Sequence, residues 1–349
     1  MSPDAALRTA LEQLATGASL TPECAAAAFG VVMRGEASAA QTAALLMGLR
    51  AKGETADEVA GAATALRGAM VRLEVGDGAV DTCGTGGGRV GTLNLSTAAA
   101  FVVAGAGVPV AKHGNRSFTS RSGSADVLEA LGIEIALEPA EASRVFAAAG
   151  LVFLFAPSYH PAMRHVGPVR RELGVPTIMN LLGPLVNPAG VRRQVIGVAD
   201  AARAPLVAHA LARLGAVHAL VLHADVGMDE VSPSGGTGVW EVREGRVQRW
   251  AIDPGIFGLA CDDLGDLAGG EPADNAARIE ALLDGRSAPA VRCAVLLNAA
   301  AALYVSGNGW NMREAVARAA ESLEGGDARR ALERLRRAAP RAKVESVSP

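Results

Sequence analysis

The stretch that decides the fold is DTCGTGGGRVGTLNLST, residues 81–97, which has glycine at five of its first eleven positions and ends in Asn94-Leu95-Ser96-Thr97. Because glycine has no side chain, successive backbone N–H groups can converge on one anion. A helix that starts near Ser96 and Thr97 would add the positive end of its dipole. Because Ala79–Thr82 resembles a short strand, the order strand, loop and helix predicts an α/β fold. Taken alone, the glycines are better explained by a tight turn with Ser96 and Thr97 as N-caps.

Two nucleotide-binding motifs are weighed against this loop. Gly86-x-Gly88-x-x-Gly91 matches the dinucleotide fingerprint, but no Asp or Glu occurs between Gly91 and Asp126 to hold the ribose hydroxyls. No Gly-Lys-Ser/Thr follows either, as a Walker loop requires. The loop is therefore interpreted as an anion site of another kind.

Composition excludes several classes of protein. The chain has 349 residues, 50% of them hydrophobic, and a mean hydropathy of +0.24, which predicts one large or two ordinary domains. Only 3% aromatic residues and a net charge of −3 argue against nucleic-acid binding. The N-terminus lacks a signal-peptide pattern and Gly or Pro interrupts the apolar runs, so we expect a cytoplasmic protein that does not bind membranes. Four widely spaced cysteines, Cys24, Cys83, Cys261 and Cys293, are expected to be small buried residues.

Residues 1–72 are predicted to be all helical. Thr21-Pro22, Ser38-x-x-Gln41 and Thr55-x-x-Glu58 are helix-start signals, and Gly53 is a stop signal. From Ala79 onward, short apolar segments alternate with helical ones, which predicts a mainly parallel sheet with helices on both faces. The predicted strands are Ala79–Thr82, Val108–Ala111, Ile133–Leu137, Val152–Ala156, Val195–Ala199 and Ala219–His223.

Two segments interrupt this alternation. Residues 160–190 are rich in proline around a charged, helix-like centre, so we expect them to leave the sheet and pack elsewhere. Residues 239–252, VWEVREGRVQRWAI, alternate apolar and polar side chains about a Glu-Gly pair and predict an antiparallel hairpin. The chain from about residue 274 onward is predicted to be helical.

A second polar loop follows the next predicted strand. AKHGNRSFTSRSGSADVLEALG, residues 111–132, places Lys112, His113, Arg116 and several hydroxyls before a helix, with no acid until Asp126. If both loops leave neighbouring parallel strands, they meet at one edge of the sheet, where ligands of open α/β sheets bind. The two loops together predict a site for a ligand with more than one phosphate.

Five motifs in this order resemble the anthranilate phosphoribosyltransferases, and the resemblance covers nearly the whole chain. The motifs are GTGGG…NLST (84–97), KHGNRSFTSRSGSADVLEALG (112–132), HPAMRHVGPVRRELG (160–174), NLLGPLVNP (180–188) and Asp229-Glu230. The resemblance implies a nucleoside phosphorylase/phosphoribosyltransferase-like fold, usually a homodimer. In that fold a small all-helical domain (1–72, completed by 165–188) joins a large α/β domain (73–164 and 189–349) with a mainly parallel central sheet.

The resemblance also implies a reaction in tryptophan biosynthesis. The phosphoribosyl group of phosphoribosyl pyrophosphate passes to anthranilate, giving N-(5'-phosphoribosyl)anthranilate and pyrophosphate. Two Mg²⁺ ions are implied at Ser96, Asp229 and Glu230, although an Asp-Glu pair alone is typical of a solvated loop. Hard oxygen ligands suit Mg²⁺. The implied partners are the two small substrates, without nucleic acid or membrane, and association with anthranilate synthase is left open.

The implied roles are assigned residue by residue. The residues implied to bind phosphoribosyl pyrophosphate are Gly84, Gly87, Gly88, Thr92, Asn94, Leu95, Ser96, Thr97, Lys112, His113, Gly114, Asn115, Arg116, Ser117, Phe118, Thr119, Ser120 and Ser124. Those implied to line the anthranilate path are Gly84, Asn115, His160, Met163, Arg170 and Gly183, and the catalytic set is Lys112, His113 and Asn115. A guanidinium at Arg170 matches a carboxylate in bidentate fashion. Whether His113 relays a proton or only donates a hydrogen bond within its loop stays open.

Two positions depart from the family pattern. Gly88 stands where the family commonly has Asp, next to Arg89, so we expect an altered Mg²⁺ dependence. Pro176 stands where the family usually has Arg, which removes a cation near the anthranilate channel or the domain hinge and stiffens the segment. The alternatives are a pyrimidine nucleoside phosphorylase-like enzyme, a non-catalytic nucleic-acid-binding paralogue and a degenerate structural paralogue.

Overall fold

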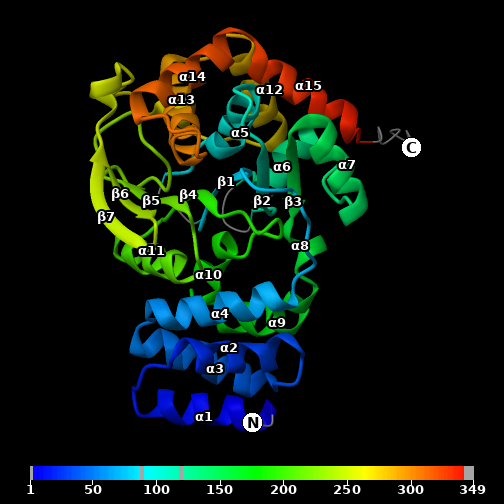
Figure 1. Ribbon diagram of the computed structural model, residues 1–349, viewed down its shortest axis with the longest axis vertical. Helices are drawn as coiled ribbons and strands as arrows, with labels where there is room; N and C mark the ends of the chain where they lie inside the picture. The colour runs from blue at the N-terminus through cyan, green and yellow to red at the C-terminus, as the bar shows by residue number, and fades with distance from the viewer. Residues whose placement is uncertain (1–2, 87–89, 118–120, 342–349) are drawn as a thin grey trace.

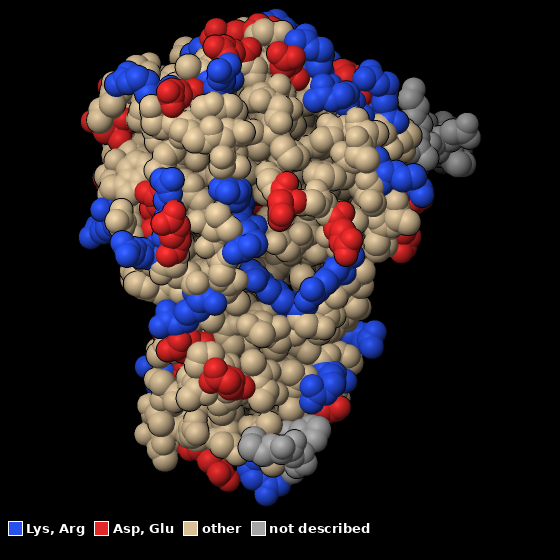
Figure 2. Space-filling model, viewed as in Figure 1, with Lys and Arg blue, Asp and Glu red and all other residues tan. Residues whose placement is uncertain are grey.

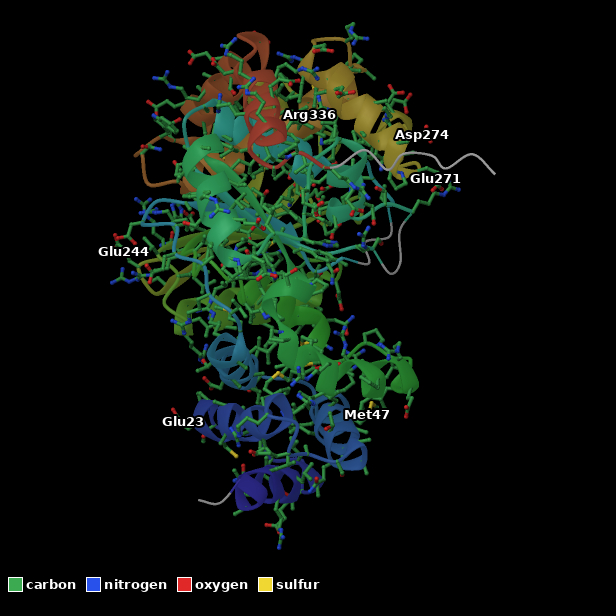
Figure 3. The ribbon with its side chains drawn as sticks, turned by 90° about the vertical axis from the view of Figure 1, so that its right-hand side faces the viewer. Glu23, Met47, Glu244, Glu271, Asp274 and Arg336 are labelled. Atoms are coloured by element: carbon green, nitrogen blue, oxygen red, sulfur yellow. The ribbon has the colours of Figure 1, made fainter. Side chains whose placement is uncertain are left out.

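The computed structural model describes residues 3–86, 90–117 and 121–341. Figure 1 shows a stack of helices at one end of an elongated molecule and a larger sheet-based part at the other, with the N-terminus in the helical stack and the C-terminus at the far end. Figure 3 shows the same division from the side, with Glu23 and Met47 on the helical stack and Arg336 on the sheet-based part.

Four N-terminal helices form the stack, as predicted. The Thr21 side chain accepts a hydrogen bond from the Cys24 N–H (3.2 Å), and both predicted capping boxes, at Ser38 and Thr55, are present. Gly53 ends its helix at φ 90°, a conformation that favours glycine. The helices are α1 (Pro3–Ala15), α2 (Pro22–Met33), α3 (Ala39–Lys52) and α4 (Ala56–Ala69).

Close packing of α2 against α4 depends on small residues. A Cβ atom at Gly61 would lie 2.3 Å from the carbonyl oxygen of Pro22 and 2.8 Å from the Ala25 Cβ. The two backbones therefore approach each other at a distance that only glycine permits at this position. This agrees with the alanine-rich and glycine-rich composition.

The sheet has seven strands in the order β3-β2-β1-β4-β5-β6-β7. Strands β1 to β5 are parallel, and the predicted hairpin adds β6 and β7 in antiparallel orientation. Its two-residue turn, Glu244-Gly245, has positive φ at both residues (52° and 75°), as tight hairpins require. The strands are β1 (Val80–Gly84), β2 (Val110–Gly114), β3 (Leu151–Phe155), β4 (Arg193–Gly197), β5 (His218–Ala224), β6 (Thr237–Arg243) and β7 (Arg246–Ile252).

The predicted strand Ile133–Leu137 is wrong. Strand β2 pairs directly with β3, so the sheet has no place for a strand between them. Ile133, Ile135 and Leu137 are buried while Glu134 and Ala136 are not, which gives the period-two pattern of a strand. The segment is extended chain held by an isolated bridge from Ile133 to Pro340 and by the Glu134 side chain.

Alternating residues of the sheet enter two separate cores. Val195 and Leu220 pack with one set of helices, and Ile196 and Val221 pack with the other. The first set is α5 (Leu95–Gly105), α6 (Ser124–Ala130), α7 (Pro139–Ala149), α12 (Pro272–Leu283), α13 (Pro289–Val305), α14 (Met312–Glu324) and α15 (Asp327–Ala338). The second core contains α11 (Ala204–Arg213) and continues into the helical stack, so the stack rests on one face of the sheet (Figure 1).

The proline-rich segment 160–190 leaves the sheet, as expected. Val166, Val169, Ile178 and Leu182 are buried in the core shared with the N-terminal helices. The segment is short and irregular, with α9 packed against α3. Its elements are a 3₁₀ turn (Pro161–His165), α9 (Gly167–Leu173) and α10 (Met179–Leu182), preceded by α8 (Ala156–Tyr159).

Within the described part of the chain, every helix is too short or too polar to cross a bilayer. On the face shown in Figure 2, Lys and Arg side chains gather in an arc across the middle of the molecule, above the helical stack. Elsewhere on that face acidic and basic side chains are interspersed.

Candidate active site

The first loop runs from the end of β1 to the start of α5. Helix α5 begins at Leu95 with Asn94 in the N-cap position, so Ser96 and Thr97 lie in its first turn, as expected. The alternative that they serve as N-caps is wrong. The Ser96 hydroxyl instead accepts a hydrogen bond from the Lys112 ammonium (3.1 Å), so one loop is joined to the next strand.

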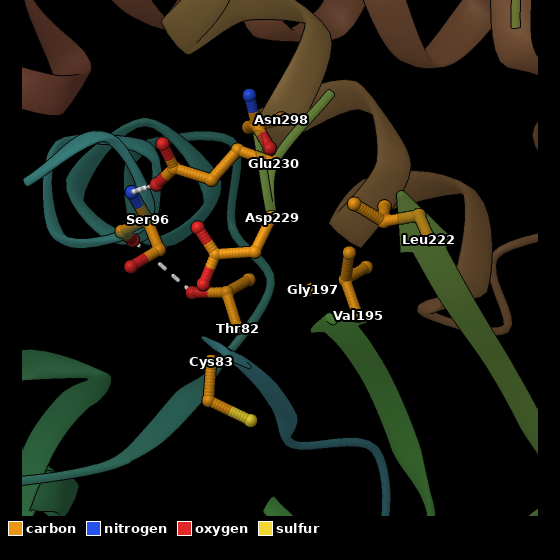
Figure 4. Close-up of a pocket in the computed structure, with 9 residues that line it drawn as sticks. All are labelled: Thr82, Cys83, Ser96, Val195, Gly197, Leu222, Asp229, Glu230 and Asn298. Atoms are coloured by element: carbon orange, nitrogen blue, oxygen red, sulfur yellow. Dashed lines mark hydrogen bonds between the residues drawn. The ribbon is translucent and has the colours of Figure 1, made fainter. Parts of the chain in front are cut away.

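Five polar residues meet at this end of the sheet, and we call them the charged cluster: Thr92, Ser96, Lys112, Asp229 and Glu230. One Glu230 oxygen accepts the Thr92 hydroxyl (2.8 Å) and the other accepts the Ser96 N–H (3.3 Å). Lys112 also donates to the Thr82 carbonyl oxygen. Ser96, Asp229 and Glu230 line one pocket at the ends of β1, β4 and β5 (Figure 4).

The acidic pair is held close to the strand ends by two glycines and an asparagine. A Cβ at Gly84 would lie 2.9 Å from Oδ2 of Asp229, and one at Gly197 would lie 1.5 Å from the Asp229 carbonyl oxygen. The Asn298 amide of α13 bonds both the N–H (3.0 Å) and the carbonyl (2.9 Å) of Val231. Bare strand ends therefore let the acidic loop lie directly on the sheet.

Burial makes the charges of this cluster unfavourable. Burial, reinforced by Asp229, raises the pKa of Glu230 to about 8, and burial also raises the pKa of Asp229. Burial lowers the pKa of Lys112, although nearby acids oppose this shift. Two close carboxylates with one ammonium nearby form a site that favours added positive charge.

The residues present fit Mg²⁺. Two carboxylates and two hydroxyls are hard oxygen donors, and Mg²⁺ is commonly held by one or two carboxylates with substrate phosphates and water. Among residues 3–86, 90–117 and 121–341, no group of three or more His, Cys, Asp or Glu side chains forms a metal centre. The remaining ligands would therefore be phosphate oxygens and water.

The second loop is tied to helix α6 and to the first loop. The Arg116 guanidinium bonds Asp126 (2.8 Å) and Glu129 (2.6 and 2.9 Å), so it braces the loop against α6. The Asn94 side chain donates to the Ser122 carbonyl (3.1 Å). The Ser124 hydroxyl bonds the Asn115 carbonyl (3.4 Å). The two loops predicted to act together therefore lie side by side.

Several predicted ligand-binding residues have specific placements. Leu95 and Thr97 are buried in the first turn of α5, and the Thr97 hydroxyl has no hydrogen-bond partner among the described atoms. Gly114 ends β2, where a Cβ would lie 2.4 Å from the Ser124 hydroxyl. The Ser117 N–H faces Asp126 (3.4 Å). Gly87, Gly88, Arg89, Phe118, Thr119 and Ser120 lie outside the described residues.

Two residues predicted for the anthranilate path, His160 and Gly183, meet His113 of the predicted catalytic set on the opposite face of β2. We call these three residues the histidine cluster. Nδ1 of His113 lies 3.2 Å from the Gly183 carbonyl oxygen, and its Nε2 lies 3.2 Å from Nε2 of His160. Because a carbonyl only accepts, His113 donates from Nδ1, so in the neutral ring its Nε2 carries no proton and can only accept. Burial lowers the pKa of His113 to about 3 and that of His160 to about 4, so both rings are neutral at pH 7.

Of the other four members of the predicted anthranilate set, Gly84 ends β1 and Asn115 follows β2, while Met163 and Arg170 lie on the neighbouring elements. Met163 follows His160 in the 3₁₀ turn, and its N–H bonds the His160 carbonyl (3.0 Å). Arg170 is half-buried on α9, where burial lowers its pKa. Among the ion pairs of the described residues, none involves Arg170, so its guanidinium is available to a carboxylate.

Sequence reasoning missed three buried polar residues beneath the site. Asp81, Asn187 and Gln194 are 0%, 3% and 1% exposed and are joined by hydrogen bonds. Asp81 and Asn187 both stand inside quoted motifs, and a polar residue inside an apolar strand pattern is a usable signal. Their pairing is not readable, because 106 residues separate them.

A segment far along the chain covers the first loop. The Leu93 N–H donates to the Leu267 carbonyl (2.7 Å), and the Gly269 N–H donates to the Gly91 carbonyl (3.0 Å). The same segment reaches the acidic loop, because the Cys261 N–H donates to the Pro233 carbonyl (2.8 Å). Backbone contacts therefore hold the outer wall of the site against the first loop, and the Arg278 guanidinium and the buried Leu267 side chain hold it against the rest of the domain.

Comparison with known proteins agrees with this geometry. The model for the α/β domain of the glycosyl transferase family matches residues 76–329, and the model for that family's helical-bundle domain matches residues 8–70. Anthranilate phosphoribosyltransferase from Xanthobacter autotrophicus is 50% identical over 93% of this chain and 94% of the relative. The crystal structure of the enzyme from Thermus thermophilus has a TM-score of 0.89 at 43% identity, covering 94% of this chain and 98% of that one.

A more distant structure carries ligands. Anthranilate phosphoribosyltransferase from Saccharomyces cerevisiae, in complex with phosphoribosyl pyrophosphate and Mg, has a TM-score of 0.87 at 28% identity, over 96% of this chain and 98% of that one. Sequence and fold agree over nearly the full length of both chains. The chain belongs to the anthranilate phosphoribosyltransferases, within the glycosyl transferase family whose helical-bundle and α/β domains it carries.

Proposed function

We propose that this chain transfers the phosphoribosyl group of phosphoribosyl pyrophosphate to the amine of anthranilate, releasing pyrophosphate, as a step of tryptophan biosynthesis. The observation that carries the proposal is the juxtaposition of two unlike clusters on opposite faces of β1 and β2. One cluster is charged and suits a diphosphate with Mg²⁺, and the other is neutral and suits an aromatic amine. The reaction needs both chemistries next to each other.

The charged cluster and the two loops are proposed to hold the diphosphate. Charge builds on the leaving oxygen as the bond from C1' to the diphosphate breaks, and fixed donors stabilise that charge. The Ser96 N–H, the Thr92 hydroxyl and the Lys112 ammonium are such donors. Glu230 occupies the first two of these donors, so diphosphate binding requires the Glu230 carboxylate to turn away from them.

Asp229, Glu230 and Ser96 are proposed to hold Mg²⁺, with two ions in the bound state. When bound, the metal neutralises charge on the diphosphate. The two raised carboxylate pKa values support this assignment, because each carboxylate gains from a nearby positive charge.

The histidine cluster, with Asn115, Met163 and Arg170, is proposed to hold anthranilate. The available Arg170 guanidinium matches the carboxylate of the substrate. The new C–N bond forms at C1' as the C–O bond to the diphosphate breaks, and the amine then loses one proton. An arylamine is largely unprotonated at neutral pH, so positioning supplies most of the catalysis.

A pKa of about 3 limits what His113 can do. A ring of such low basicity does not hold a proton at neutral pH, so His113 is proposed to orient the amine and to pass on a proton only in transit. Lys112 and Asn115 complete the proposed catalytic set, Lys112 from the charged cluster and Asn115 from the loop after β2.

Gly88 and Pro176 remain the two proposed sources of difference from the family. We propose that Gly88 in place of Asp weakens one Mg²⁺ position and that Arg89 screens the diphosphate instead. Gly88→Asp should therefore lower the Mg²⁺ concentration needed for half-maximal activity. An unchanged Mg²⁺ profile would discard this idea. Pro176 and its neighbour Val175, which is 47% exposed, lie on the surface after α9, where the segment can affect closure over anthranilate.

The test of the function is direct. When purified protein is mixed with phosphoribosyl pyrophosphate, anthranilate and Mg²⁺, the fluorescence of anthranilate should fall and pyrophosphate should be released. Chelation of Mg²⁺ should stop the fall in fluorescence and the release of pyrophosphate. Thymidine or uridine with phosphate serves as the control reaction and should give no free base. Phosphorolysis without consumption of anthranilate would overturn the proposal.

We further propose a cytoplasmic homodimer in which residues 1–72 and 165–188 form a small domain that moves relative to 73–164 and 189–349. The helical stack and segment 160–190 share one core, which supports grouping them in one domain, and the same core continues onto α11 and the sheet. All four cysteines are free thiols, which suits a reducing compartment. Sedimentation of the purified protein measures the oligomeric state, and addition of anthranilate synthase to the same run tests that association.

A further inference from the structure

We propose that Asp81 and Asn187 form a buried positioning pair that sets the anthranilate side of the site without touching either substrate. The proposal rests on the function given above and deepens it. Neither residue belongs to the charged cluster or to the histidine cluster. The pair lies beneath both and acts through His113 and the backbone around Gly183.

The contacts of the pair are direct. Oδ1 of Asp81 accepts the His113 N–H (3.2 Å), and Oδ2 accepts the Asn187 amide (2.8 Å). The same amide nitrogen of Asn187 donates to the Ala111 carbonyl (2.8 Å), and its oxygen accepts the Ala189 N–H (2.8 Å). Asn187 therefore connects the end of the proline-rich segment to β1 and β2 at once.

A carboxylate is required at position 81 because its surroundings only donate. Besides the His113 N–H and the Asn187 amide, the Gln194 amide lies 3.5 Å from Oδ2. An amide at position 81 would set an NH₂ group against the NH₂ of Asn187, and a buried polar group left without a partner is costly. The hydrogen-bond donors around position 81 therefore require Asp there, and contact with a ligand does not.

The pair controls a short run of backbone at the acceptor pocket. Three successive carbonyls, those of Gly183, Pro184 and Leu185, accept hydrogen bonds from His113 (3.2 Å), Gln194 (2.9 Å) and Arg67 (2.7 Å). Asn187 ends this run and ties it to Asp81. If the tie to Asp81 is lost, Gly183 and the His113 ring shift together, because each holds the other.

The hydrogen bonds of the pair lie on one face of the sheet, although the Asp81 charge also acts on Lys112. Asp81 and His113 face the proline-rich segment, whereas Thr82 and Lys112, the next residue in one strand and the preceding residue in the other, face Ser96 on α5. A displacement below the sheet should therefore reach anthranilate before it reaches the diphosphate. This separation makes the proposal testable by comparing the two substrates.

The first experiment compares two matched asparagines. Asn187→Ala should raise the KM for anthranilate about tenfold. It should leave the KM for phosphoribosyl pyrophosphate within about twofold. Asn298→Ala removes an equally buried amide that also makes three hydrogen bonds but holds the acidic loop, so it should show the reverse pattern and raise the Mg²⁺ requirement. Direct titration of anthranilate by its fluorescence gives Kd values independent of turnover.

Three further variants, one of them a double variant, test the pair in case Asn187→Ala does not fold, and they isolate the part played by Asp81. Gln194→Leu removes the tie to Pro184 from another strand and should give the same split to a smaller degree. Asn187→Asp places two carboxylates together, and adding Asp81→Asn exchanges the pair, so the double variant should bind anthranilate more tightly than Asn187→Asp alone.

Several outcomes would overturn the proposal. These are equal changes in both KM values, a lowered Tm with unchanged anthranilate affinity, or a double variant no better than Asn187→Asp. Failure of the proposed function is a different result, because the unsubstituted protein would then not convert anthranilate at all.

Discussion

The charged cluster and the histidine cluster are built from the same two strands by opposite means. Lys112 and His113 are neighbours on β2, yet their side chains have different surroundings. Lys112 lies among buried charged and polar groups, whereas His113 contacts the neutral ring of His160 and the Gly183 carbonyl. The charged cluster is incomplete without a ligand that balances it, whereas the histidine cluster is already satisfied internally. The period-two alternation of a strand thus keeps the charged cluster and the histidine cluster on separate faces.

The largest expected effect tests the charged cluster. Lys112→Met removes the one ammonium beside Ser96 and should lower kcat/KM about 10³-fold, since a fixed donor at the leaving group is lost. Lys52→Met is the control, because Lys52 is a partly buried lysine paired with Glu58 (3.0 Å) in the helical stack. The control should lower Tm and leave kcat/KM within about twofold. Similar losses of kcat/KM in both variants would show that Lys112 has no specific role at the leaving group.

A smaller effect is expected from crowding the acidic pair. Gly84→Ala places a methyl group near Asp229 and should cut activity at limiting Mg²⁺ by about tenfold to a hundredfold, with recovery as Mg²⁺ rises. Gly68→Ala on α4 is the control, because a Cβ there meets nothing within 4 Å. A Mg²⁺ titration of both variants decides the point, and loss of activity that Mg²⁺ cannot restore would speak against a metal role for Asp229.

A substitution at the proposed anthranilate site should have a smaller effect and should change the KM of anthranilate only. Arg170→Lys keeps the charge but loses the planar fork, so the KM for anthranilate should rise about tenfold with little change for phosphoribosyl pyrophosphate. Arg171→Lys, on the exposed side of the same helix, should behave like the parent protein. Equal KM values in the Arg170 variant and the parent would place the carboxylate elsewhere.

The smallest effect concerns stability against acid. The pKa of His113 in the fold, about 3, lies below the usual 6.5, so the unfolded chain binds more protons between these values. The contribution of His113 to the free energy of unfolding is therefore fully present above pH 6.5. It declines as the pH falls, by up to about 1.4 kcal/mol per pH unit. Between pH 6 and 4, His113→Gln should reduce the slope of the unfolding free energy against pH by up to about 1.4 kcal/mol per pH unit. The exposed His209→Gln provides the comparison, and parallel profiles for all three proteins would show that the His113 ring is not desolvated.

Local signals in the sequence predicted most of the fold. The capping boxes, the Glu-Gly hairpin turn and the alternation of strands with helices are properties of a few adjacent residues, and the structure confirms them. Ile133–Leu137 failed because burial on one side produces alternation whether or not a neighbouring strand exists. A sequence pattern reports which side chains are buried but not what covers them.

The site was predictable where a motif is contiguous. The two loops could be found from their glycine, hydroxyl and charge content, and the Asp-Glu pair from the family resemblance. The structure brings Thr92, Ser96, Lys112 and Glu230 together. The network of Asp81, Asn187 and Gln194 could not be found in this way, because its partners come from β1, the proline-rich segment and β4. The sequence also did not show that Arg116 pairs with Asp126 and Glu129 and so holds the second loop against α6.

The segment between β7 and α12 has a consequence for how related enzymes can diverge. It contacts the first loop through main-chain atoms, which nearly every amino acid supplies alike, so its exposed positions can vary without loss of that contact. Gly269 and Leu267 are constrained, because a Cβ at position 269 would lie 2.6 Å from the Thr92 carbonyl oxygen and the Leu267 side chain is buried in the core. Selection for altered affinity can therefore act by lengthening or shortening this segment on either side of Gly269, without changing any residue that touches a substrate.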